Sequence, residues 1–202
     1  MSFSPTQYRE TDYRQGDVVD RHGLRGPDYV GLCCPLSASW LVAVEENKEP
    51  AHWSWAASEG GAKQLRAMGT TYNPVSMSCY AGRDWFRLSH KKTLLPTHRL
   101  SEALTEGSPW KIVRLRGMLS TSTFPVAFRP LGHVLAVVVG SSTVRLMDAN
   151  HGVYAVPTNQ LDAWFTSLCA SYTAGDVGRA GQPRYLIAGI EVSDVTKEDE
   201  DF

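Results

Sequence analysis

The sequence predicts an α+β domain in which helices come first and a mostly antiparallel sheet follows. In the first third of the chain, apolar residues recur at helical spacing, at Leu36, Trp40, Leu41 and Val44. The second half instead holds short apolar or β-branched runs separated by turn residues, a pattern typical of strands. With 202 residues, of which 43% are hydrophobic, the chain is long enough to bury one sizeable core.

Two helices are expected in the first half. The first begins after Pro35, which suits the opening turn of a helix, and ends before Pro50. The second runs from Ser58 to Met68, because Ser58 can cap its start and Gly69 can end it.

Five strands are expected later in the chain, with one helix before the last of them. The strands are Ile112 to Leu115, Val134 to Val139, Val144 to Met147, Val153 to Val156 and Tyr185 to Ile190. The helix follows Thr158, a residue that can cap it, and its apolar face is formed by Leu161, Trp164, Phe165 and Leu168. We therefore expect an N-terminal helical part packed on a C-terminal antiparallel sheet.

The two ends of the chain differ from the part between them. Residues 1–26 are polar and lack apolar periodicity, so we interpret them as a mobile leader. Residues 196–202 are interpreted as an acidic tail. One folded domain, residues 27–195, remains between these segments.

Charge and cysteine content disfavour several classes of function. The formal net charge of -1 gives no general attraction to nucleic acid. No apolar run approaches the roughly 20 residues that span a bilayer, and the first residues do not form a secretory signal, so we expect the chain to fold in a cytoplasm. The four cysteines do not form the paired CxxC motifs of zinc sites, and neither a metal nor another cofactor is expected.

Cys33 is the candidate nucleophile. It lies at the mouth of the first predicted helix, where unpaired amides and the helix dipole stabilise a thiolate, the form of cysteine that attacks carbonyl groups. The alternative is a cysteine that only packs in the core. Cys34 is a second candidate, because Pro35 disfavours helical geometry at Cys34 and suggests that Cys34 is the cap. The residue pattern alone does not choose between the two thiols.

His133 and Asp148 are the candidate base and its orienting partner. His133 begins an apolar strand that ends before a Gly-Ser pair at positions 140 and 141, which suits a two-residue type II′ turn. If Val139 pairs with Ser142 across this turn, His133 lies directly opposite Asp148. Directly opposed residues have Cβ atoms about 5 Å apart, close enough for a carboxylate to bind one ring nitrogen and leave the other for a thiol.

Two alternatives to this pairing stay open. A longer turn would instead bring Asn150 near His133, so Asn150 is the reserve orienter. His133 is also explained as a half-buried residue at the start of a strand, with no catalytic role.

The same residues resemble the motifs of a known family. The first block, Gly-x-Cys-x-x-Leu-x-x-x-Trp, is formed by Gly31, Cys33, Leu36 and Trp40. The second is Gly132-His133 with its strand, followed by Asp148-x-Asn150-x-Gly152-x-Tyr154 and Trp164-Phe165. Both are similar to the YopT/AvrPphB-type papain-like cysteine protease effectors, over about residues 31–170. The resemblance favours Cys33 over Cys34 and implies a papain-like catalytic domain with the triad Cys33, His133 and Asp148.

Asp28 is the candidate for the side chain of the oxyanion hole. Papain-like enzymes place a side-chain donor a few residues before the nucleophile, and Asp28 stands five residues before Cys33. An ionised carboxylate cannot donate a hydrogen bond, so Asp28 would have to be protonated or act in another way. The alternative is a turn residue that follows Pro27.

The resemblance implies a cysteine protease that acts as a virulence effector and cleaves a host protein. Such a protein would be made in the bacterial cytoplasm and injected without a signal peptide, with a host substrate and a secretion chaperone as partners. Two other activities use the same triad: deamidation or transglutamination of a host protein, and hydrolysis by a cell-wall amidopeptidase. A papain-like shell that only binds a partner is the non-enzymatic alternative.

Overall fold

The computed structural model describes residues 4, 6–24, 31–70, 87–91, 94–120, 128–130, 132–174 and 184–196. The helices are α1 (Gln15–Arg21), α2 (Cys33–Glu45), α3 (Glu49–Ala57), α4 (Glu59–Thr70), α5 (Leu100–Leu104) and α6 (Leu161–Ala174). The strands are β1 (Arg9–Thr11), β2 (Arg87–Lys91), β3 (Trp110–Ser120), β4 (Phe128–Pro130), β5 (His133–Val139), β6 (Thr143–Asp148), β7 (Gly152–Pro157) and β8 (Arg184–Thr196).

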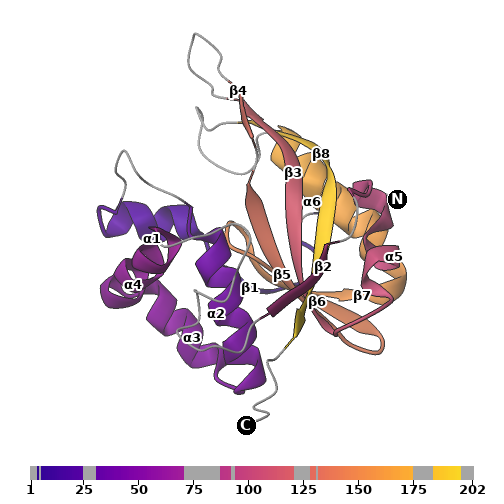
Figure 1. Cartoon of the computed structure of the whole chain (residues 1–202). Coiled ribbons are helices and arrows are strands. Elements are labelled where there is room, and N and C mark those ends of the chain that lie inside the picture. Colours follow the sequence, from indigo (N-terminus) through magenta and orange to yellow (C-terminus); the bar gives the residue numbers. More distant parts are fainter. Residues whose placement is uncertain are drawn as a thin grey trace.

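All strands join one antiparallel sheet. Its order is β1-β7-β6-β5-β3-β8-β2, and β4 pairs with β3. Helices α1 to α4 lie on one side of the sheet, and α5 and α6 lie on the other (Figure 1). The predicted α+β class, with helices before a mostly antiparallel sheet, is therefore confirmed.

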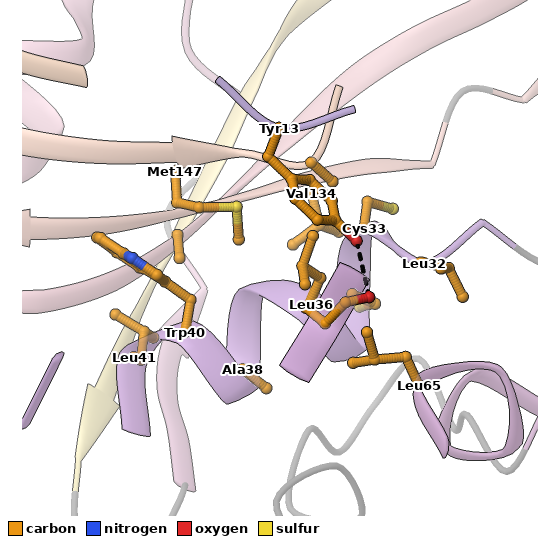
Figure 2. Packing of buried hydrophobic residues seen from close by; sticks show 14 of the residues in the cluster. Tyr13, Leu32, Cys33, Leu36, Ala38, Trp40, Leu41, Leu65, Val134 and Met147 are labelled. Atoms are coloured by element: carbon orange, nitrogen blue, oxygen red, sulfur yellow. Dashed lines mark hydrogen bonds between the residues drawn. The ribbon is translucent and has the colours of Figure 1, made fainter. Parts of the chain in front are cut away.

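Two layers of apolar side chains hold the helices to the sheet. On one face, α2 packs Leu36 and Trp40, both fully buried, in a cluster with Val134 and Met147 (Figure 2). On the other face, Trp164 of α6 belongs to a second cluster, to which β5 contributes the residues that alternate with Val134. Because both faces of β5 are covered, its sequence is a continuous apolar run instead of an alternating one.

The two helices predicted in the first half are present, with different ends. α2 ends at Glu45, and Asn47 takes a positive φ of 55° just after it. Ser58 caps α4 as expected, since its Oγ accepts the N–H of Gly61 at 3.1 Å. Gly69 does not end this helix, which continues to Thr70.

Pro50 has a different role from the one expected. The sequence predicts that Pro50 stops the preceding helix, but it occupies the first turn of α3, a helix that the sequence pattern did not predict. Proline suits this position because the first amides of a helix have no carbonyl partner within it.

All five predicted strands are present as β3, β5, β6, β7 and β8, and the helix predicted after Thr158 is α6. The predicted hairpin register between β5 and β6 is wrong by two residues, because Val139 pairs with Val144 and not with Ser142. Gly140 has no positive φ, which a type II′ turn would require at that position. Instead, its N–H donates to the carbonyl of Thr143 at 3.0 Å, which moves the turn one residue along the chain.

The interpretation of residues 1–26 as a mobile leader is wrong for the segment 9–24. β1 pairs with β7, with Arg9 opposite Tyr154. In α1, Val18 is 4% exposed and Val19 is fully buried. The apolar residues of this segment are too few to show a period in the sequence, but they pack on the same cluster as α2.

One residue of the predicted acidic tail lies within the described part of the chain. Thr196, which we had placed in the tail, belongs to β8 and lies opposite Arg87. Residues 197–202 lie outside the described residues.

We expect Val19→Ala to lower the free energy of unfolding by about 2 kcal/mol, because it removes buried methyl groups and leaves a cavity. Arg21→Ala, on the exposed side of the same helix, is the matched control and should change it by less than about 0.5 kcal/mol. Urea denaturation measures both variants. Two equally small effects would mean that α1 does not contribute to the folded core.

Candidate active site

Three elements bring the predicted site residues together. Cys33 begins α2, His133 begins β5 and Asp148 ends β6. His133 Nε2 lies 3.0 Å from Asp148 Oδ1, and the Cys33 thiol lies 3.8 Å from the carbonyl oxygen of Gly132, the residue before His133. All three side chains are buried: Cys33 is 8% exposed, His133 4% and Asp148 0%.

The contact between His133 and Asp148 forms although the predicted register is wrong. Asp148 is paired with Leu135, two residues along the strand from His133. Side chains alternate between the two faces of a strand, so a shift of two residues leaves both groups on the same face. A diagonal pair of this kind is within reach of long side chains, and the imidazole spans the difference.

Asp148 accepts hydrogen bonds from other groups besides His133, the one donor that the sequence predicts. Its Oδ1 also accepts the backbone N–H of Asn150 at 2.8 Å, and its Oδ2 accepts the hydroxyl of Tyr172 at 2.6 Å. The Tyr172 oxygen is in turn 3.0 Å from His133 Nε2. Since Asp148 and Tyr172 both engage Nε2, the other ring nitrogen, Nδ1, is left for the sulfur of Cys33.

The pKa values of the buried pair shift in opposite directions. Burial alone would lower the pKa of His133, but the Asp148 carboxylate and then the Cys33 sulfur raise it above its ordinary value. Burial would raise the pKa of Asp148, but the charge and hydrogen bond of His133 bring it below its ordinary value. Each partner favours the charged form of the other, which gives an imidazolium–carboxylate pair.

The remaining candidate residues have other positions. Cys33 is the cysteine whose sulfur raises the pKa of His133, while Cys34, also buried, is the next residue of α2. Asn150, the reserve orienter, contacts Asp148 through its backbone and Tyr172 through its side chain, at 3.2 Å from Nδ2 to the hydroxyl. Asp28 lies outside the described residues, so its oxyanion role stays a prediction.

Two residues of the site, Tyr172 and Gln15, are not predicted by the sequence pattern. Tyr172 lies four residues after Leu168 on the apolar face of α6, so the pattern alone indicates a core residue. Gln15 was assigned to the leader, yet it is buried, and its Nε2 donates to Asn150 Oδ1 at 2.6 Å. Neither residue has a signal that a single sequence reveals.

Within the described ranges, no group of three or more His, Cys, Asp or Glu side chains could hold a metal ion. No helix in this part of the chain combines the length and apolar character needed to cross a membrane.

A helix that begins at a cysteine, packed on an antiparallel sheet that supplies a histidine and an aspartate, is the arrangement of papain-like cysteine proteases. The fold of this chain is therefore of the papain-like class, as the sequence resemblance implied.

One of two solved structures compared with this chain, AvrPphB, is similar enough to support this fold. The crystal structure of the Pseudomonas avirulence protein AvrPphB matches with a TM-score of 0.58 at 17% identity, covering 96% of this chain and 100% of that chain. PatoxP, a cysteine protease-like domain of the Photorhabdus asymbiotica toxin PaTox, matches with a TM-score of 0.48 at 11% identity, covering 95% of this chain and 55% of that chain. No protein-family model matches the sequence, and no curated protein matches it significantly.

The opposite pKa shifts predict how stability depends on pH. The raised pKa of His133 contributes stability that is complete below the unfolded-state value of about 6.5 and is lost as the pH rises toward the folded-state value. The lowered pKa of Asp148 contributes stability above about pH 3.9, which is lost as the pH falls toward the folded-state value. Asp148→Asn should therefore reduce the free energy of unfolding most between about pH 4 and 6.5, and less toward about pH 9.

Urea denaturation of the wild type and Asp148→Asn at about pH 6 and 9 measures this difference. Val19→Ala is the control, because its effect should be the same at both pH values. A difference between wild type and Asp148→Asn that does not change with pH would contradict the assigned ion pair.

Proposed function

We propose that the protein is a papain-like cysteine protease that acts as an injected bacterial effector and cleaves a host protein through Cys33, His133 and Asp148. The observation that carries this proposal is the buried imidazole of His133, held by Asp148 at 3.0 Å, with the sulfur at the start of α2 lying 3.8 Å from the carbonyl oxygen of the preceding residue, Gly132. A nucleophile, a base and an orienting carboxylate in this order are the groups that acyl transfer by a cysteine requires.

Each residue has a distinct part in the proposed reaction. His133 holds the proton taken from Cys33 as an imidazolium, and the sulfur attacks the carbonyl carbon of the scissile peptide bond. The imidazolium then protonates the leaving amine, and a water molecule, activated by the neutral imidazole, releases the acyl group from the sulfur. Asp148 accepts a hydrogen bond from the N–H at Nε2 throughout, which fixes the ring with Nδ1 toward the sulfur.

The start of α2 supports the charge changes in this reaction. The helix has 13 residues, and its first intrahelical hydrogen bond runs from the N–H of Leu36 to the carbonyl of Leu32 at 2.9 Å. The N–H of Cys33, in the first turn, has no carbonyl partner within the helix, so the dipole and this donor favour negative charge at Cys33. We propose that the backbone N–H of Cys33 also stabilises the oxyanion of the tetrahedral intermediate.

The biological setting is proposed from the shared fold. AvrPphB, which has the same fold, is a Pseudomonas avirulence protein. We propose by comparison that this chain is made in a bacterial cytoplasm, exported with a secretion chaperone and delivered to a host cell, where a host protein is its substrate.

Labelling with a thiol-reactive peptide electrophile, followed by mapping of the modified residue, tests the nucleophile. We expect Cys33→Ala to lose both labelling at this site and proteolysis by several orders of magnitude, because the three groups act as a unit. Cys34→Ala, which changes the neighbouring buried thiol, is the matched control and should keep most of both. Full activity in Cys33→Ala would refute the assignment.

The products show which reaction the site performs. Proteolysis yields fragments of the incubated protein, whereas deamidation of a glutamine leaves it intact and adds about one dalton, through the same acyl-enzyme chemistry. Intact-mass measurement separates the two outcomes, and a deamidated, uncut protein would overturn the proposed peptide cleavage.

We expect Asp148→Asn to retain more activity than His133→Ala. An asparagine oxygen in place of Oδ1 can still accept from His133 Nε2 and from the N–H of Asn150, while its amide nitrogen faces Tyr172. The ring orientation is then kept and only the charge is lost, whereas His133→Ala removes the base itself. Rates of well-folded purified variants decide this, and equal, complete inactivation of both would mean that Asp148 does more than orient the ring.

A further inference from the structure

Gln15 presents an unused hydrogen-bond acceptor at the edge of the proposed catalytic site. It is the first residue of α1 and is 8% exposed, and its backbone N–H donates to the carbonyl of Ala149 at 2.8 Å. The side-chain Nε2 donates to Asn150 Oδ1. The Oε1 atom is buried and has no hydrogen-bond partner in the part of the chain that the structure describes.

The orientation of the Gln15 amide follows from a chain of hydrogen bonds that begins at Asp148. An ionised carboxylate only accepts, so the hydroxyl proton of Tyr172 points to Asp148. The Tyr172 oxygen must then accept from Asn150, which places Nδ2 of Asn150 toward Tyr172 and Oδ1 toward Gln15. Gln15 consequently donates Nε2 to Asn150 and turns Oε1 the other way.

The free Oε1 atom lies next to the nucleophile. A Cβ atom added to Gly31 would be 3.9 Å from Gln15 Oε1 and 3.9 Å from Cys33 Sγ. The two atoms thus border the same space beside Gly31, and they are separated by no more than twice that distance. Gly31 has no side chain, so it places no Cβ of its own in the space that these two atoms border.

We propose that Gln15 Oε1 accepts a backbone N–H of the peptide substrate next to the carbonyl that Cys33 attacks. This inference rests on the proposed function and deepens it. The acceptor selects substrate chains that carry an N–H at this position and rejects proline or N-alkylated residues there. A carbonyl oxygen cannot donate, so Gln15 in this orientation binds the substrate backbone and does not stabilise the oxyanion.

Two peptide reagents and one small reagent test the proposal. The first is a chloromethyl ketone of a capped dipeptide, and the second is the same reagent with methyl groups on both amide nitrogens, so that it has no N–H. Both alkylate a thiolate, with loss of chloride, after forming a tetrahedral adduct at the ketone. Methyl methanethiosulfonate, which has no amide, reports the reactivity of the Cys33 thiol by itself. The rate of Cys33 modification is measured by mass spectrometry.

We expect the wild type to react faster with the N–H reagent than with its methylated form, and we expect Gln15→Met to reduce this preference about 5-fold, the size of a net neutral hydrogen bond. Reaction with methyl methanethiosulfonate should be similar in both proteins. Gln160→Met is the matched control, because Gln160 accepts a hydrogen bond from Tyr8 outside the site, and it should keep the full preference.

A second variant keeps the test valid if Gln15→Met does not fold. Gly31→Ala places a methyl group in the space between Sγ and Oε1 at ordinary contact distances of 3.9 Å, so the fold should tolerate it. It should also reduce the preference for the N–H reagent.

Three outcomes would overturn the inference. An unchanged preference in folded Gln15→Met would show that Oε1 does not contact the substrate N–H. An equal loss of rate with both peptide reagents would indicate a donor to the oxyanion instead. Failure of all three reagents to modify Cys33 in the wild type would refute the proposed function, and the inference with it. Methyl methanethiosulfonate distinguishes this outcome, because it modifies Cys33 in the first two outcomes and does not modify it in the third.

Discussion

Asp148 holds a negative charge at a position with no exposure to solvent, where an unpaired charge would be very costly. Three donors from separate parts of the chain compensate it: His133 at the start of β5, the N–H of Asn150 after β6, and Tyr172 near the end of α6. The loss of one donor would leave the others around an incompletely satisfied carboxylate. The arrangement of the site and the docking of α6 therefore depend on the same buried charge.

The hydrogen bonds around Asp148 also connect the two apolar layers of the protein. Cys33 belongs to the cluster on the side of the sheet covered by α2, and Tyr172 belongs to the cluster on the side covered by α6. His133 and Asp148 connect them by hydrogen bonds at the ends of their strands. Burial and the charge of Asp148 raise the pKa of Tyr172 well above its ordinary value, so its hydroxyl remains a donor to the carboxylate.

Sequence patterns predicted the parts of this arrangement that depend on local repetition. The helix that follows Cys33 and the strand that follows His133 are long periodic or apolar segments, and both are present. The pairing of His133 with Asp148 was predicted with the wrong register, and the contact survived because a two-residue shift conserves the face of a strand. Gln15 and Tyr172 could not be predicted, since their roles arise from contacts between segments far apart in the chain.

The pairing of β1 with β7 delays the completion of the fold during synthesis. Arg9 lies opposite Tyr154, so the first strand leaves the ribosome long before its partner is synthesised. Contacts between residues so far apart in the sequence form late in folding, because the chain between them must be ordered before the contacts can form. Gln15 and Cys33 likewise meet Asn150 and His133 only when most of the chain is complete. A nascent or unfolded chain therefore contains an ordinary thiol, and the assembled site exists only in the finished fold.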